Sequence, residues 1–81
     1  MNDQEIHDRI TALVQQEHDL RDALAAGRLS SEDERARLRN TETALDQCWD
    51  LLRQREARRE AGQNPEEAAT RPAAEVEHYQ Q

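Results

Sequence analysis

The apolar residues in the first third of the chain recur at alternating steps of four and three positions. This spacing is typical of a helix that packs against another helix. The stripe is interrupted once, at Glu17, and otherwise consists of Ile6, Ile10, Leu13, Leu20 and Leu24. Asn2 followed by Glu5 matches a helix-capping pattern, and Gly27 suits the left-handed residue that ends a helix. The pattern predicts a helix over about residues 3–26.

A second stripe with the same alternation follows, made of Leu38, Thr41, Leu45, Cys48 and Leu52. Ser31 and Glu34 form a capping-box pattern in front of it. Arginines crowd the last turns, where the helix dipole favours positive charge, and Gly62 follows them. We therefore expect a second helix over about residues 31–61.

The connection between these stretches is only Arg28-Leu29-Ser30, which forces two helices to lie antiparallel. In the resulting register Ile10 faces Cys48. The polar interruption of the first stripe meets that of the second, in a layer of Glu17, Asn40 and Thr41. Such a layer fixes helix register, and a ligand site within a bundle is the alternative interpretation. The predicted fold is an all-α antiparallel two-helix hairpin formed by residues 1–61.

The remaining segment, residues 62–81, changes in character and contains both prolines of the chain. Asn64-Pro65 predicts one short helical turn, while Val76 and Tyr79 are its only large apolar or aromatic anchors. We expect a mostly flexible tail with short helical turns.

The second helix carries an apolar arc wider than one facing helix can cover. Its members are Leu45, Cys48, Trp49, Leu51 and Leu52. A chain of 81 residues with one cysteine has no internal disulfide to supplement its core. These residues therefore predict a homodimer, a four-helix bundle in which a second copy or a protein partner covers the Trp49 side.

A net charge of −7 argues against a protein that coats nucleic acid. One stretch is nevertheless basic: Arg53, Arg55, Arg58 and Arg59 extend past the residues that the first helix can face. They are candidate contacts for phosphate, RNA or an acidic partner, and a solvated helix end is the alternative. The chain shows no membrane-spanning run and no secretory signal, so we expect a cytoplasmic protein.

Residues suited to catalysis do not form a set. Cys48 lies on the packed stripe, which favours an inert buried thiol. His7 and His18 are scattered, and Glu75 with His78 gives one copy of a Glu-x-x-His spacing that di-metal bundles need twice. We therefore expect no enzymatic activity, no cofactor and no metal.

The block Leu45-Asp46-Gln47-Cys48-Trp49-Asp50-Leu51-Leu52-Arg53-Gln54-Arg55 resembles domain-of-unknown-function family 2630, a group of small actinobacterial proteins. The segments Gln4-Glu5-Ile6, Gly27-Arg28-Leu29-Ser30, Arg58-Arg59-Glu60-Ala61-Gly62, Arg71-Pro72 and Val76-Glu77-His78-Tyr79 are similar as well. The resemblance implies a bacterial cytoplasmic protein but supplies no activity or catalytic residue. The sequence as a whole favours a non-catalytic interaction module, with a nucleic-acid-associated accessory protein as the alternative.

Overall fold

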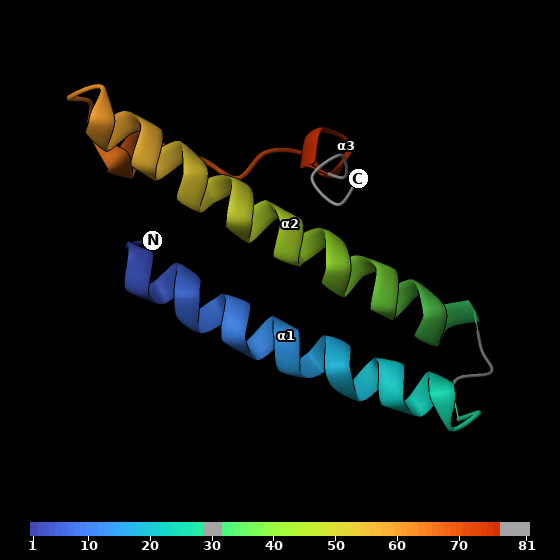
Figure 1. Ribbon diagram of the computed structural model, residues 1–81. Helices are drawn as coiled ribbons and strands as arrows, with labels where there is room; N and C mark the ends of the chain where they lie inside the picture. The colour runs from blue at the N-terminus through green and yellow to red at the C-terminus, as the bar shows by residue number, and fades with distance from the viewer. Residues whose placement is uncertain (29–31, 77–81) are drawn as a thin grey trace.

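The computed structural model describes residues 1–28 and 32–76. Two long helices, α1 (Asp3–Ala25) and α2 (Glu32–Glu60), lie antiparallel along each other (Figure 1). A 3₁₀ turn, η1 (Pro65–Glu67), and a short helix, α3 (Ala73–Val76), follow them. The molecule is elongated, with extents of 50 × 24 × 18 Å. The predicted all-α antiparallel hairpin is confirmed.

Both ends of α1 are fixed by local hydrogen bonds. The Asn2 side chain accepts from the Glu5 amide at 2.8 Å, and the Glu5 carboxylate accepts from the Asn2 amide at 3.1 Å. At the other end Gly27 has φ +74°, and the Arg28 amide donates back to the Ala23 carbonyl at 2.7 Å. This is a Schellman motif, which satisfies carbonyls that the last helical turn leaves free.

The C-terminal end of α2 repeats this motif at Gly62, whose φ is +73°. The Gly62 amide donates to the Arg59 carbonyl at 3.2 Å, and the Gln63 amide donates to the Arg58 carbonyl at 2.7 Å. The predicted capping residue Ser31 lies outside the described residues, as do Leu29, Ser30, His78 and Tyr79.

The hydrophobic core lies far from the turn between the helices. Its buried members are Ile6, Ile10, Leu45, Cys48 and Leu51, with Leu13, Leu52 and Ala68 packed against them. Leu38 is also buried, nearer the turn and outside this cluster. Each buried side chain of this size contributes about 1.5–3 kcal/mol. Near the turn, Leu20 and Leu24 are only half-buried. The predicted pairing of Ile10 with Cys48 therefore lies within the best-packed part of the hairpin.

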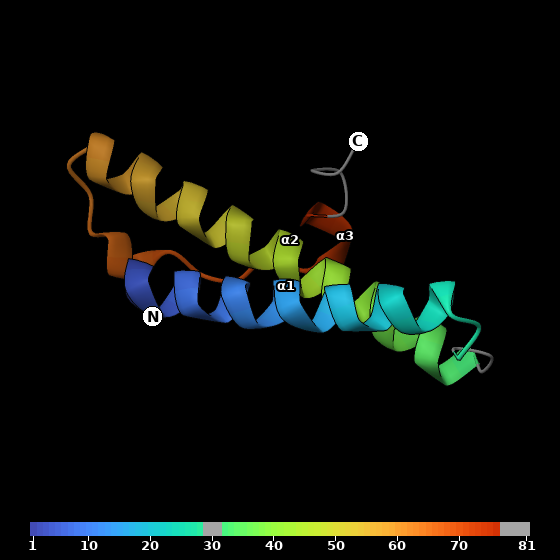
Figure 2. The same cartoon turned by 60° about the horizontal axis from the view of Figure 1, so that its bottom comes forward.

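After Gly62 the chain reverses and residues 63–76, named the strap here, run back along α2 (Figures 1 and 2). Asn64 caps the predicted short turn, its side chain accepting from the Glu66 amide at 3.0 Å. Val76, expected to act as an anchor, is fully buried at 0% exposure. The strap thus packs on the hairpin, a placement that the sequence left open.

Candidate functional site

One flank of α2 leaves a large aromatic side chain uncovered. Trp49 is 47% exposed, although it lies between the buried residues Cys48 and Asp50. The His7 ring of α1 meets the indole edge-on, with ring centroids 6.5 Å apart and an interplanar angle of 81°. Aromatic surface of this kind is enriched at protein–protein interfaces, so this flank is the candidate functional site.

Trp49 and His7 line a surface groove of about 260 Å³. Leu52 contributes to the same groove and is half-buried against the core. The rest of the lining is charged, two acidic and two basic side chains: Asp3, Glu56, Arg53 and Arg59. We name these seven residues the Trp49 face. Its charges balance formally, in a chain whose net charge is −7.

The structure divides the five residues predicted to contact a second copy or a partner. Leu45, Cys48 and Leu51 are buried within the single chain. Leu51, which the sequence placed beside Trp49 on the open flank, is only 8% exposed because it packs in the core beside the strap residue Ala68. The assignment of Leu51 to the open flank is therefore corrected, and Trp49 with part of Leu52 remains.

The arginine-rich end of α2 also differs from the solvent-exposed overhang expected for it. Arg55 is buried and forms ion pairs with Asp3 of α1 and, at 3.1 Å, with Glu66 of the strap. Arg59 also pairs with Asp3, at 2.9 Å. The strap lies alongside this end because Gly62 reverses the chain. Arg55 and Arg59 therefore already bind carboxylates of the same chain, which weakens the interpretation as a nucleic-acid contact.

The other two arginines predicted as anion contacts lie in different surroundings. Arg58 reaches Glu67 of the strap at 3.5 Å. Arg53 is exposed and lines the groove of the Trp49 face. The four arginines therefore do not share one anion-binding surface: they are divided between the strap, the N-terminus of α1 and the groove.

Asp3 joins the start of α1 to the end of α2. The guanidinium groups of Arg59 and Arg55, hydrogen-bonded to this carboxylate, hold the pKa of Asp3 below its usual range. Asp3 also occupies the first turn of α1, where a negative charge complements the helix dipole. A single carboxylate thus aligns the ends of the two helices.

The predicted polar layer is present only in part. Thr41 is buried, and its hydroxyl donates to the Arg37 carbonyl at 2.9 Å. Glu17 is half-buried and lies 3.9 Å from Arg21, which reaches across to Glu42 of α2 at 2.9 Å. Asn40 is exposed, because it lies one position, about 100°, around α2 from Thr41. At the level of this layer, the ion pair that joins the two helices is therefore Arg21–Glu42.

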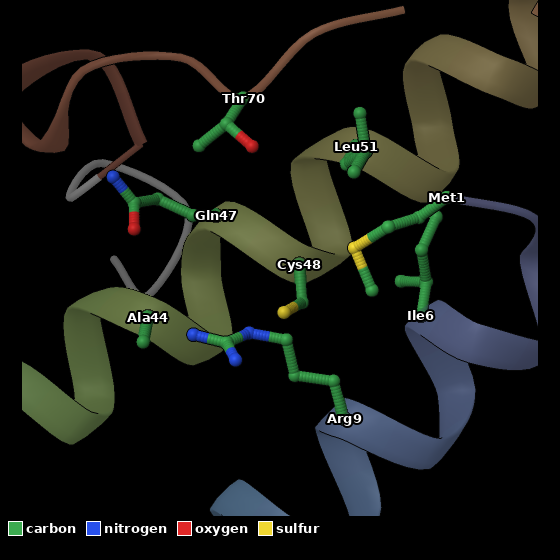
Figure 3. Close-up of a pocket in the computed structure, with 8 residues that line it drawn as sticks. All are labelled: Met1, Ile6, Arg9, Ala44, Gln47, Cys48, Leu51 and Thr70. Carbon is green, nitrogen blue, oxygen red and sulfur yellow. The ribbon is translucent and has the colours of Figure 1, made fainter. Parts of the chain in front are cut away.

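Cys48 borders a small cleft of about 80 Å³ between the helices and the strap (Figure 3). The Arg9 side chain extends toward it from α1, and the Met1 side chain lies on the same side. Burial raises the pKa of the Cys48 thiol, although the positive charge of Arg9 opposes this effect. A buried thiol held protonated is a poor nucleophile, in agreement with the packing role expected from its position.

The predicted site residues did not include Gln47, Asp50 and Gln54 of α2, which hold the strap together with Arg55 and Arg58. Asp50 is fully buried and accepts from Gln54 at 2.8 Å, with Arg71 of the strap 3.3 Å away. Gln54 and Gln47 donate to carbonyls of the strap. The one available signal was a pair of opposite charge patterns, arginines at positions 55 and 58 and consecutive acids at 66 and 67.

Comparison with known proteins gives a family and close relatives. A model of the family described as "Protein of unknown function (DUF2630)" matches residues 2–81. Uncharacterized proteins of Mycobacterium bovis and of two Mycobacterium tuberculosis strains are each similar to this chain at 49% identity over 77 residues. The alignment covers 95% of this chain and 88% of each relative. No solved structure matches the chain.

Within residues 1–28 and 32–76, every helix is too short or too polar to cross a membrane. The same part of the chain contains no cluster of three His, Cys, Asp or Glu side chains arranged to hold a metal ion.

Proposed function

We propose that this chain, which belongs to the DUF2630 family of proteins of unknown function, is a non-catalytic helical interaction module of the cytoplasm. It self-associates through the Trp49 face and binds a protein partner. The exposure of Trp49 beside His7, in a groove with charged walls, is the observation that carries the proposal.

The exposed surface of Trp49 favours association with a second copy of the chain. Burying the exposed part of an indole contributes favourable free energy, and tryptophan is among the residues that dominate interface affinity. A stable interface covers roughly 600–1,000 Å² on each partner. The chain exposes 5588 Å², so such an interface uses a modest share of its surface.

The charged residues that line the groove also favour association with a second copy. Two chains that each carry −7 repel each other at long range. The Trp49 face pairs two acids with two arginines, so its formal charges cancel. In a two-fold symmetric contact the same patch meets itself, and a patch with both signs can place acids opposite arginines. This face is therefore suited to a self-complementary interface.

Sedimentation of the full chain over a range of concentrations tests self-association. We expect a monomer–dimer equilibrium for the natural chain and a dissociation constant raised about 30-fold or more by Trp49→Ala, as for an interface hot spot. Val14→Ala is the matched control, because Val14 is 49% exposed but lies on α1 outside the groove. A natural chain that stays monomeric at high micromolar concentration, or equal effects of both substitutions, would contradict the proposal.

A further inference from the structure

The strap lies on a flank of α2 distinct from the Trp49 face, and it runs antiparallel to the helix. Three α2 side chains reach main-chain carbonyls of the strap. Arg55 donates to Pro65 at 3.2 Å, Gln54 to Ala69 at 2.7 Å and Gln47 to Arg71 at 3.1 Å. Positions 47, 54 and 55 fall on one side of the helix because seven or eight residues span two turns. These bonds are made to the main chain of the strap, whatever side chains it carries.

Other contacts make the same flank selective for particular side chains. Glu66 and Glu67 of the strap meet Arg55 and Arg58, at 3.1 and 3.5 Å. Ala68 packs against the core directly after these acids. Val76 is fully buried at the other end of the strap. The flank therefore fits a segment with two consecutive acids in a helical turn, a small residue after them and a branched apolar anchor further on.

The strap is held by exposed ion pairs and by a few buried contacts. Glu67 is 67% exposed and its partner Arg58 is 31% exposed, so this ion pair contributes little to stability. The Glu66 side chain is 59% exposed, but its partner Arg55 is buried. Val76 is the one large apolar side chain of the strap that is fully buried. Gly62, with its positive φ, supplies a turn before the strap without being part of it. Because it has few buried apolar contacts, the strap opens locally at a lower free energy than the core of the hairpin does.

We propose that the strap-binding flank of α2 is a docking surface for an acidic segment of another protein, and that the strap occupies this surface when no such segment is bound. This inference rests on the proposed function as an interaction module and names the chemistry of the partner. It uses a surface separate from the Trp49 face, so one molecule can self-associate and dock a partner segment at the same time.

A segment from outside has to compete with the strap, which is tethered at an effective concentration in the millimolar range. Peptide binding to the natural chain is therefore weak, and it strengthens when the strap is released. The full chain carrying Glu66→Lys and Val76→Asp is the released variant, because the changes reverse one ion pair and place a charge at the buried anchor. Glu66→Lys alone, at an exposed position, replaces it if the double change lowers helicity.

The probe is a synthetic fluorescent peptide with the natural sequence of residues 62–76, titrated with each full-length protein and followed by anisotropy. We expect the released variant to bind it at least ~10-fold more tightly than the natural chain does, since the tethered competitor is gone. A peptide in which lysines replace Glu66 and Glu67 should lose this binding, because Arg55 and Arg58 would then face like charges.

Substitutions on α2 locate the binding flank. In the released variant, Gln47→Ala should weaken peptide binding because Gln47 donates to the Arg71 carbonyl. Gln15→Ala should not, because the amide of Gln15 donates to Asp19 on α1. Equal binding of the natural and lysine peptides, or no binding by the released variant, would overturn the inference. So would straps exchanged between two copies of the natural chain, detected as dimers that persist in Trp49→Ala. Peptide binding retained in Trp49→Ala separates this result from any failure of self-association.

Discussion

The two flanks of α2 beside its contact with α1 differ in how far the chain covers them. On one flank Ala68 of the strap packs against the core cluster that contains Leu51, and Arg71 of the strap reaches the buried carboxylate of Asp50. On the other flank Trp49 is 47% exposed, and no strap crosses it. Both flanks carry large apolar side chains, so hydrophobicity alone does not decide which one the chain covers itself.

The polar groups around each flank explain the difference. Gln47, Gln54 and Arg55 donate to main-chain carbonyls of the strap, so these carbonyls are satisfied there. The Trp49 face instead presents charged side chains around an aromatic ring. The row of hydrogen-bond donors therefore favours covering of this flank by the strap, whereas the charged rim of the Trp49 face offers no such row to a following segment.

The largest expected effect separates the flanks by stability. Leu51→Ala should lower the free energy of unfolding by about 2–5 kcal/mol, because it leaves a cavity in the core. Trp49→Ala should lower it by about 1 kcal/mol or less at concentrations below dimer formation, since half of the side chain already contacts water. Urea unfolding followed by circular dichroism gives both values.

Leu51→Met is the conservative control for this comparison, because it keeps the side-chain volume and should cost less than about 1.5 kcal/mol. If Leu51→Ala and Trp49→Ala destabilise the dilute chain equally, the two flanks are not covered differently in solution.

A smaller effect concerns the ion pairs of Asp3 with Arg59 and Arg55, named the clasp here, which join the start of α1 to the end of α2. The pKa of Asp3 is lower in the folded chain than in the unfolded one, because Arg59 and Arg55 bind its ionised form. Its contribution is therefore fully present above the unfolded pKa of about 3.9 and disappears as the pH falls through the lower folded pKa. Asp3→Asn should reduce stability at pH 7 and flatten the loss of stability between about pH 4 and 2.

Urea midpoints measured across that acid range provide the test, with Asp19→Asn as the comparison on the exposed side of α1. A natural chain and an Asp3→Asn chain with parallel pH profiles would show that the clasp does not form in solution.

The smallest effect is a difference in thiol reactivity at the strap-covered flank. Burial raises the pKa of the Cys48 thiol, so the folded chain holds less thiolate at pH 8 than the unfolded chain. A disulfide reagent should label the folded protein at least about 10-fold more slowly than the same protein in urea. The released-strap variant should fall between these rates, because the strap residue Thr70 lines the cleft at Cys48. Equal labelling of the natural and released chains would argue against this shielding.

Much of the hairpin was predictable because the interactions that define it are local. Asn2 and Glu5 are three positions apart, and Gly27 acts through bonds within one helical turn. The alternating stripes fix the facing sides of the helices once the short connection makes them antiparallel. Such signals lie within a few residues of the structure that they specify.

The position of the strap could not be predicted in this way. Its hydrogen bonds to α2 side chains through main-chain carbonyls join residues 10 to 24 positions apart, and every residue has such a carbonyl. Arg55 therefore read as part of a solvated cationic end, although Asp3 and Glu66 enclose it. Leu51 was predicted to lie on the open flank, but it belongs to the core cluster, against which the strap residue Ala68 packs.

The distance between the core and the turn at Gly27 has a consequence for how the hairpin folds. Ile6 and Leu51, both in the core, are about 45 positions apart in the chain, so a large loop must close before they meet. Closing a loop of about 50 residues costs roughly 1.4 kcal/mol more than closing one of about 10. Zipping outward from the turn gains little at first, since Leu20 and Leu24 pack only partly. We therefore expect slower folding than for helical hairpins whose strongest contacts flank the connection.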